Sequence, residues 1–264
     1  MTATTSARKT ALITGASSGI GRALAGCFAA DGWNLVLAAR GVAAMEALAA
    51  DLTKRHGITA TVIAADLSSA EGARGLHAEV ERRGLALDAL VANAGAGTYG
   101  DVRDGDLAKD VAMIQLNVTA VVVLARLFLP GLLARRGKIL VTASTAAFQP
   151  CPHMAIYGAT KAFVLSYCEA LAEELSGTGV TVTALCPGPT ATGFFDVADM
   201  KQSALVKGKR LPTSEEVAAV GYRGMLKGRR VVIPGVMNWL FAQSVRFAPR
   251  RAVTMLAAAM MRRV

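Results

Sequence analysis

The chain has 264 residues, of which 53% are hydrophobic, and its 29 lysines and arginines outnumber its 19 aspartates and glutamates. An apolar content this high excludes an intrinsically disordered chain, and the length predicts one large domain rather than two small ones. The four cysteines form no CxxC pair and the first ten residues contain no apolar run, so we expect a cytoplasmic protein with free thiols rather than a secreted, disulfide-bonded one.

Short apolar runs alternate with stretches of helical periodicity in the first half of the chain. Buried strands are predicted where these runs are rich in branched residues, at 10–14, 33–40, 59–66 and 87–95. Helices are predicted between and after them, at 22–32, 41–57, 69–83 and 106–134. The segment 118–134 is strongly apolar, but Arg126 and Pro130 interrupt it and it is shorter than the ~20 residues of a membrane span. We therefore expect a buried interface helix there.

The same alternation continues in the second half of the chain. Strands are predicted at 137–145, 180–188 and 229–235, and a helix at 155–177. The long mixed segment 189–212 is a candidate substrate lid, and 236–264 is a basic helical extension. Continuous apolar strands alternating with helices indicate a parallel sheet that is covered on both faces. The predicted fold is therefore α/β: a doubly wound Rossmann-type parallel sheet of seven strands, in a single domain over 1–264.

The sequence TGASSGIG at 14–21 lies between the first predicted strand and the first predicted helix. A doubly wound fold binds a dinucleotide at this position. A glycine cluster alone is weak evidence for dinucleotide binding, but its place between a strand and a helix strengthens that interpretation. Gly15 can form the tight turn, Gly19 lets the backbone approach a pyrophosphate, and Gly21 allows the helix to pack closely on the strand. The phosphate would then face free N–H groups at the start of the helix. An ordinary turn between strand and helix is the alternative.

The spacing Thr14-Gly15-x-x-x-Gly19-x-Gly21 resembles that of the short-chain dehydrogenase/reductase family, and the resemblance covers about residues 8–195. It implies that the cofactor contacts several loops at the ends of the strands. In the glycine loop these contacts are Gly15, Ser17, Ser18, Gly19, Ile20 and Gly21. After the third and fourth strands they are Asp66, Leu67, Asn93, Ala94 and Gly95. Near the nicotinamide end they are Tyr157, Lys161, Pro187, Gly188 and Thr190, with Thr192 as the alternative to Thr190.

The end of the second predicted strand indicates which nucleotide is bound. Many NAD-binding folds carry an acid there that binds the ribose 2′-hydroxyl, but this chain has Ala39 followed by Arg40. Alanine cannot make that contact, whereas arginine can pair with a 2′-phosphate through two hydrogen bonds. We therefore predict NADP(H) as the cofactor, with Arg22 as a second candidate cation. A surface arginine that ends a strand is the alternative for Arg40.

Tyr157 and Lys161 are four residues apart, so both project from one face of the predicted helix. A nearby ammonium lowers the pKa of a phenol and can make it a proton donor suited to carbonyl reduction. Most such pairs are ordinary surface residues, but Asn117, Ser144, Tyr157 and Lys161 match the family's catalytic tetrad in order and approximate spacing. The resemblance implies hydride transfer between a nicotinamide and a carbonyl or secondary alcohol. Tyr157 would be the acid or base, Ser144 would stabilise the carbonyl oxygen and Asn117 would anchor a water. No metal-ligand spacing appears.

We expect an apolar substrate pocket closed by 189–212 and by the residues near 97–103 and 148–154. Four apolar side chains suggest a hydrophobic ketone, although packing of the lid would explain them equally well: Phe148, Met154, Phe194 and Phe195. Cys151 and His153 either line the pocket or have a structural role.

The excess of basic residues lies entirely beyond residue 200, where the chain has 13 lysines and arginines and only two acidic residues. A solvated basic surface is the preferred interpretation, and peripheral contact with an anionic membrane is the alternative. Nucleic acid is not expected, because few aromatic residues and no binding motif accompany the charge. Near the C-terminus, one helical face carries Val253, Leu256, Ala257 and Met260. We expect this face to pack in a homodimer or homotetramer, or else to rest on anionic lipid. The resemblance also implies homo-oligomers, through the helices at 106–134 and 155–177.

Two rival functions use the same fold, since a fold does not determine a function. One is a non-catalytic NADP-binding regulator and the other is a membrane-associated protein. A protein that only binds has no need of Tyr157 and Lys161 together. The sequence therefore favours an NADP(H)-dependent oxidoreductase that interconverts a carbonyl and a secondary alcohol.

Overall fold

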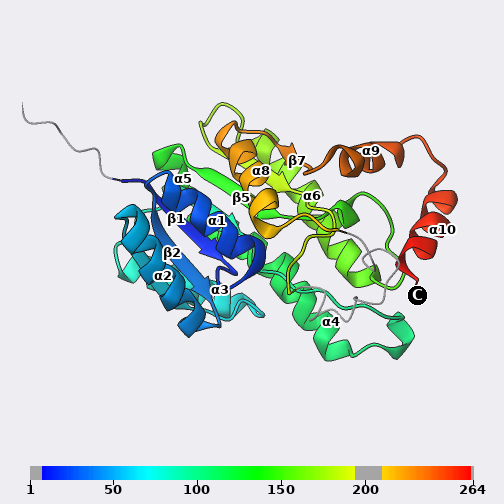
Figure 1. The fold of residues 1–264 in the computed structure, drawn as a ribbon, viewed down its shortest axis with the longest axis horizontal. Coiled ribbons are helices and arrows are strands. Elements are labelled where there is room, and N and C mark those ends of the chain that lie inside the picture. The colour runs from blue at the N-terminus through cyan, green and yellow to red at the C-terminus, as the bar shows by residue number, and fades with distance from the viewer. Residues whose placement is uncertain (1–7, 194–209, 263–264) are drawn as a thin grey trace, which may run out of the picture.

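The computed structural model describes residues 8–193 and 210–262, and these form a parallel sheet of seven strands, as predicted (Figure 1). The strands are β1 (Thr10–Thr14), β2 (Asn34–Ala39), β3 (Ala60–Ala64), β4 (Ala89–Ala92), β5 (Lys138–Thr142), β6 (Thr181–Leu185) and β7 (Val231–Val232). Their spatial order is β3-β2-β1-β4-β5-β6-β7. The chain builds outward from β1 to β3 and then crosses back to place β4 beside β1. The strand order therefore reverses between β1 and β4, which is where such sheets bind ligands.

Helices cover both faces of the sheet because successive residues of a strand point to opposite sides. Leu12 of β1 packs in the core under α3 (Ala70–Arg82), α5 (Ala120–Arg135) and α6 (Ala155–Glu174). The next residue, Ile13, packs in the other core, under α1 (Gly19–Ala30), α2 (Val42–His56) and α8 (Ser214–Leu226). The continuous apolar strands seen in the sequence therefore fill two separate cores, one on each face.

The helix predicted at 106–134 is continuous but not uniform. It consists of α4 (Leu107–Ile114), one π-helical turn (Gln115–Thr119) and α5. Among the described residues, Leu107–Arg135 is the one helical segment long and apolar enough to cross a membrane. Leu124, Phe128 and Leu132 on its inner face are buried against the sheet, as in the core helix of a folded domain. The outer face exposes Leu107, Val111 and Ile114.

Among the described residues beyond β6, three helices are present. Helix α8 (Ser214–Leu226) was not predicted, and it begins with a capping box in which Thr213 and Glu216 each accept a hydrogen bond from the other's backbone N–H. After β7 come α9 (Val236–Ser244) and α10 (Arg250–Met261), which lie at the side of the molecule opposite α2 and α3 (Figure 1). Short 3₁₀ turns at Val102–Asp104 and Thr145–Ala147 complete the described elements. The candidate lid lies mainly at 194–209, outside the described residues.

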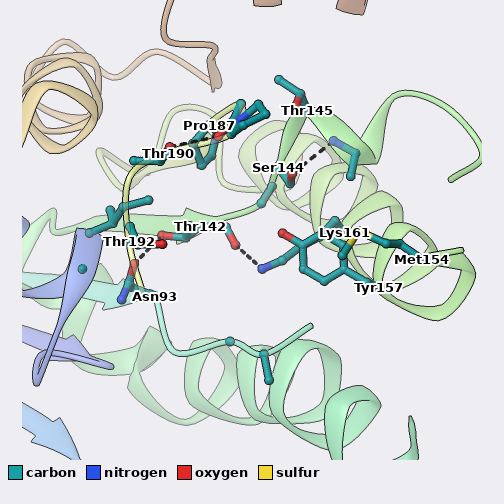
Figure 2. Close-up of a pocket in the computed structure, with 18 of the residues that line it drawn as sticks. Asn93, Thr142, Ser144, Thr145, Met154, Tyr157, Lys161, Pro187, Thr190 and Thr192 are labelled. Carbon is teal, nitrogen blue, oxygen red and sulfur yellow. Dashed lines mark hydrogen bonds between the residues drawn. The ribbon is translucent and has the colours of Figure 1, made fainter. Parts of the chain in front are cut away.

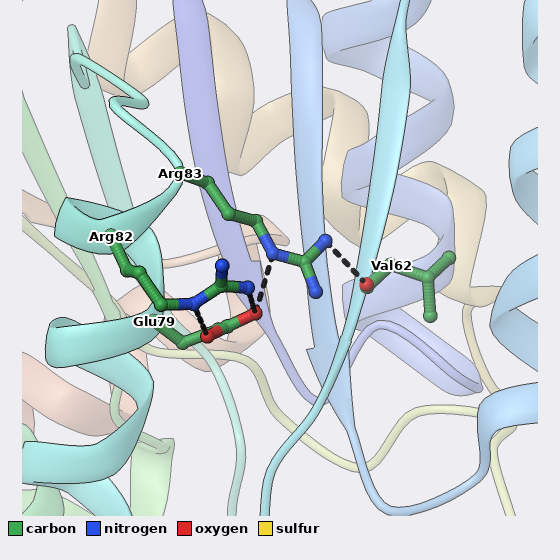
Figure 3. A network of polar contacts seen from close by, with 4 residues as sticks. All are labelled: Val62, Glu79, Arg82 and Arg83. Carbon is green, nitrogen blue, oxygen red and sulfur yellow. Dashed lines mark hydrogen bonds and ion pairs between the residues drawn. The ribbon is translucent and has the colours of Figure 1, made fainter.

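The edge strand β3 has a neighbouring strand on one side only, and a polar network lies along its other side (Figure 3). Glu79 of α3 accepts hydrogen bonds from Arg82 at 2.7 Å and from Arg83 at 2.6 Å. Arg83 also donates to the Val62 carbonyl of β3 at 3.4 Å. These hydrogen bonds to the two guanidinium groups lower the pKa of Glu79 to about 2. A charged side chain on a free edge also discourages pairing with another chain.

Candidate active site

A cavity of about 830 Å³ lies at the carboxyl ends of the strands, where the strand order reverses. Residues from the segments that follow β1 to β6 line part of it, and residues of α9 and α10 line the rest. The predicted site residues in its wall are Gly15, Ser17, Ser18, Gly19, Ile20, Arg40, Asp66, Leu67, Asn93, Ala94, Gly95, Ser144, Tyr157, Lys161, Pro187, Gly188 and Thr190. Gly21 and Asn117 lie behind the wall. One cavity thus brings together the predicted cofactor and catalytic residues.

Each of the three loop positions requires glycine, for different structural reasons. Gly15 and Gly19 have positive φ angles of 67° and 53°, which favour glycine. A side chain on Gly15 would also lie 2.9 Å from the Ala94 Cα. Gly21 has no room for a side chain, because its Cβ would lie 2.3 Å from the Gly15 carbonyl oxygen. The Ser18 side chain does not cap α1, so the first N–H groups of this helix can face a phosphate. The loop therefore fits the pyrophosphate of a dinucleotide.

Hydrogen bonds fix the turn after β4 to the neighbouring strands. The Thr14 Oγ1 accepts from the backbone N–H groups of Asn93 and Ala94, both at 3.0 Å. The Asn93 side chain donates to the Thr14 carbonyl at 3.0 Å and accepts from the Thr142 hydroxyl at 3.0 Å (Figure 2). Neither threonine was among the predicted site residues, although each ends its strand at the edge where the site lies. The ends of β1, β4 and β5 are thereby held together beneath the cofactor region.

Lys161, in the cavity wall, and Asn117, behind it, are both buried, and each has a defined set of partners. The Lys161 Nζ donates to the Thr142 carbonyl oxygen at 2.8 Å, and burial lowers the pKa of this lysine to about 8 (Figure 2). Asn117 lies in the π-helical turn, and its Nδ2 donates to the Ala96 carbonyl at 2.9 Å and to the Thr160 hydroxyl at 3.0 Å. Its Oδ1 accepts from the Ala96 N–H at 3.0 Å. The Asn117 side chain therefore fastens the segment after β4. The predicted water contact of Asn117 remains a prediction.

Tyr157 and Ser144 come from different elements and meet in the cavity. Ser144 follows β5, and its hydroxyl accepts from the Ala146 N–H at 3.1 Å. Burial raises the pKa of Tyr157 to about 12, and a hydrogen bond with Ser144 opposes part of that rise. We predicted that Lys161 lowers this pKa, but burial raises it instead, and the Lys161 Nζ lies 5.7 Å from the centre of the phenol ring. Tyr157 is therefore protonated at neutral pH, which is the form that can donate a proton.

Arg40 lies where the predicted 2′-phosphate contact should be. It directly follows β2, its side chain is exposed, and it lines the cavity. The pKa of Asp66 at the same end of the cavity is lowered, chiefly by the Ser68 N–H that it accepts at 3.0 Å and also by the charge of Arg40. The other candidate cation, Arg22, is exposed but is not part of the cavity wall. No group of three or more potential metal ligands occurs in the described parts of the chain.

The other end of the cavity is mainly apolar, and the sequence analysis anticipated only part of it. From the predicted loops, Gln149 and Met154 line the cavity, whereas no residue of 97–103 does. Phe148 packs against the core under α6 instead, and Phe194 and Phe195 lie outside the described residues. Of the two open candidates, Cys151 is buried against Gly158 and His153 contacts Asp101 at 2.7 Å, so both have structural roles.

Two C-terminal helices supply the part of the wall that the sequence analysis missed. The α10 face expected to pack on another copy or on lipid lines the cavity, through Val253, Leu256, Ala257 and Met260. Leu256 and Met260 are also exposed, and the expected contact with another copy or with lipid remains a prediction. Phe241 and Val245 contribute from α9 and the residue after it. The helical periodicity identified the α10 face correctly, but sequence alone could not show what lies opposite that face.

The comparisons with known proteins agree with this geometry. The family model for short chain dehydrogenases matches residues 9–202. The very-long-chain 3-oxoacyl-CoA reductase of Anas platyrhynchos is 32% identical over 88% of this chain and 74% of that protein. A short-chain dehydrogenase of Sphingobium yanoikuyae in complex with NADPH has a TM-score of 0.80 at 31% identity, covering 90% of this chain and 94% of that one. A bulky-bulky ketone specific alcohol dehydrogenase of Comamonas testosteroni has a TM-score of 0.78 at 30% identity, covering 92% and 93%.

Solved structures similar to this chain hold a nicotinamide dinucleotide, which is NAD in some and NADP in others. A solved family member from Burkholderia phymatum holds NAD, whereas the Sphingobium yanoikuyae enzyme holds NADPH. The glycine loop, the half-buried Tyr157, the buried Lys161 and the family match together make this chain an oxidoreductase that uses a nicotinamide dinucleotide to interconvert a carbonyl and an alcohol. The protein belongs to the short-chain dehydrogenase family.

Proposed function

We propose that this enzyme uses NADPH to reduce bulky, apolar ketones. The choice of NADPH depends on one observation, which is that Arg40 lines the cavity directly after Ala39, the residue at the position where NAD-binding folds carry an acid. A guanidinium can bind a 2′-phosphate through two parallel hydrogen bonds, whereas Ala39 offers nothing to a free 2′-hydroxyl. The glycine loop supplies the remaining backbone contacts to the cofactor.

The residues of this chain provide the acid and the positioning for the reaction. Bound NADPH would supply the hydride. Tyr157, protonated at neutral pH, would donate its proton to the carbonyl oxygen of the substrate, and Ser144 would hydrogen-bond the same oxygen as negative charge develops on it. Lys161 is held beneath the site by Thr142 and would place its positive charge close to the reacting groups. The same groups would serve alcohol oxidation in reverse.

The substrate class is proposed from the wall that α9 and α10 provide. Phe241, Val245, Leu256 and Met260 face the cavity together with Met154, so this end offers mainly apolar contacts. An apolar ketone gains free energy from such burial, whereas a charged substrate would lose its hydration without a partner. The ketone-specific enzyme of Comamonas testosteroni resembles this chain over nearly its full length, which supports the same class.

A screen of NADPH oxidation across small polar, small apolar and bulky apolar ketones tests this proposal, with NADH as the comparison cofactor. We expect the highest kcat/KM with NADPH and a bulky apolar ketone. A strong preference for NADH would contradict the role of Arg40. Tight NADPH binding without turnover of any ketone would instead favour the non-catalytic regulator.

We also propose a homo-oligomer in the cytoplasm, assembled through α4, α5 and α6. Leu107, Val111 and Ile114 on α4 and Phe163 on α6 are exposed in the single chain. Exposed apolar side chains on adjacent helices are typical of surfaces that pack on another subunit. Light scattering of the purified protein measures the number of subunits, and Val111→Glu is expected to reduce it.

A further inference from the structure

The C-terminal helices expose an unusual number of large apolar side chains. Among the described residues, nine of the seventeen exposed large hydrophobic side chains lie between Val236 and Met260. Six of them lie outside the cavity wall: Val236, Met237, Trp239, Leu240, Phe247 and Met255. We call the exposed surface of residues 236–262 the C-terminal face. Phe247 is 89% exposed, so these side chains remain largely in water in the single chain.

Arginines accompany these apolar side chains, and acids do not. Arg246, Arg250, Arg251 and Arg262 are all exposed, and the chain contains no aspartate or glutamate after Glu216. None of the four forms an ion pair with another residue that the structure describes. Arg251 and Met255 of α10 are four residues apart, so they lie on one side of the helix, and Arg262 directly follows the last helical residue.

This charge pattern distinguishes between two possible occupants of the C-terminal face. A symmetric contact between two copies would bring arginines against arginines, with no acid on the face to neutralise them. An anionic bilayer supplies phosphate groups for the arginines and an apolar interior for the Trp239 and Phe247 side chains. Tryptophan also favours the boundary between the headgroups and the acyl chains. The combination fits an anionic lipid surface better than a second copy.

The C-terminal face is continuous with the wall of the cavity. Phe241, Leu256 and Met260 each line the cavity and are also exposed to solvent. The apolar end of the site therefore opens among the residues of this face. An apolar molecule dissolved in a bilayer could pass from the lipid into the site without crossing water.

We propose that the C-terminal face docks the enzyme peripherally on anionic membranes. The inserted groups are the exposed apolar side chains of α9, of Phe247 and of Met255, and the arginines bind the lipid phosphates. This binding goes beyond the proposed reductase activity, and it can be measured without any turnover. Failure of the ketone screen would therefore leave the docking proposal standing, and failure of docking would leave the reductase proposal standing.

The two tryptophans of the chain make the test specific for this face. Trp33 is buried, with 6% of its surface exposed, whereas Trp239 is 51% exposed on the C-terminal face. The full-length protein is mixed with vesicles of equimolar phosphatidylglycerol and phosphatidylcholine, or of phosphatidylcholine alone. Co-sedimentation measures binding, and the blue shift of tryptophan emission measures entry of Trp239 into the lipid. Trp239→Phe should abolish the shift while most of the binding remains.

A charge-reversal variant with a matched control tests the arginines. Arg250→Glu/Arg251→Glu changes the first turn of α10, where acids are compatible with a helix N-terminus, so the helix should still form. Each arginine near an anionic surface contributes roughly fivefold, so we expect loss of the two to lower the vesicle partition coefficient at least about 25-fold. Lys54→Glu/Arg74→Glu makes the same charge change on α2 and α3 and should retain binding at the level of the unaltered protein.

Three results would overturn the proposal. The first is vesicle binding that the Arg250→Glu/Arg251→Glu variant retains but the Lys54→Glu/Arg74→Glu control loses. The second is vesicle binding by the unaltered protein without a blue shift of Trp239 emission. The third is an absence of vesicle binding together with a self-association that Phe247→Ser disrupts, which would show that a second copy covers the face.

Discussion

Replacing Lys161 by methionine should stabilise the cofactor-free protein at neutral pH and abolish its activity. Methionine has a similar length and no charge, so it can fill the buried space that the lysine chain occupies. The folded protein holds Lys161 with a pKa lowered to about 8 by burial, against 10.5 in the unfolded chain. Its ammonium is therefore less favourable in the folded state than in water.

The magnitude follows from the pKa difference. A lowered lysine pKa makes the unfolded state bind more protons between pH 8 and 10.5, so the stability of the folded protein rises with pH across that window. Below pH 8 the buried Lys161 charge lowers the free energy of unfolding by its full amount. The pKa difference between 10.5 and about 8 corresponds to about 3 kcal/mol. Methionine removes this cost but leaves the Thr142 carbonyl without its donor, which costs about 1 kcal/mol. The variant should be about 2 kcal/mol more stable at pH 7, and the two proteins should be about equal near pH 10.

Urea unfolding of both proteins at several pH values checks this, at one protein concentration so that any subunit association is constant. The difference in the free energy of unfolding should shrink steadily from pH 8 to pH 10. Destabilisation at pH 7, or a difference that does not change with pH, would refute the argument that burial penalises the Lys161 charge. A binding measurement with NADPH separates loss of the cofactor contact from loss of the chemical step.

Four further outcomes are expected. Tyr157→Phe should bind NADPH almost normally, as measured by fluorescence, but its kcat should fall at least about a hundredfold because the proton donor is gone. Arg40→Ala should raise the KM for NADPH about ten- to a hundredfold and leave that for NADH nearly unchanged, since only a 2′-phosphate can lose a charged contact. Ala252→Phe, in the cavity wall, should lower kcat/KM for bulky ketones and spare small ones; an equal loss for both would argue against the proposed pocket. Glu79→Gln should lower the Tm at pH 7, and the difference from the unaltered protein should narrow as the pH falls from 4.5 toward 2, because the lowered Glu79 pKa contributes stability only while its carboxylate is charged.

The strands and their parallel arrangement could be predicted because they depend on local pattern and on general rules. Continuous apolar runs identify strands that are buried on both faces, and alternation with helices implies a parallel sheet. The α8 helix escaped prediction although Thr213 and Glu216 form a capping box at its start. Gly221 and Gly224 weaken its helical pattern in the sequence. Glycine is needed at both positions because of packing against the sheet. A Cβ on Gly221 would lie 2.7 Å from Leu185, and one on Gly224 would lie 2.3 Å from Val232.

The candidate site likewise contains residues that could be predicted from the sequence and residues that could not. Residues of the glycine loop and the Tyr157–Lys161 pair could be found from sequence because their spacing follows from local geometry, and the resemblance to the family added Asn93, Ala94 and Gly95. The contacts of Thr14 and Thr142 could not be assigned, because they join strands that are distant in the sequence. Neither could the pKa of Tyr157, since its rise comes from burial by the whole fold.

The origin of the cavity wall has a consequence for how this enzyme can evolve. The acid, the lysine and the cofactor loops all come from residues before 194, whereas much of the apolar wall comes from α9 and α10, near the end of the chain. Mutation or recombination that replaces the last thirty or so residues can therefore remodel substrate choice while the inherited hydride chemistry stays intact. In this arrangement, related enzymes can acquire new substrates by exchange of the segment that contains α9 and α10.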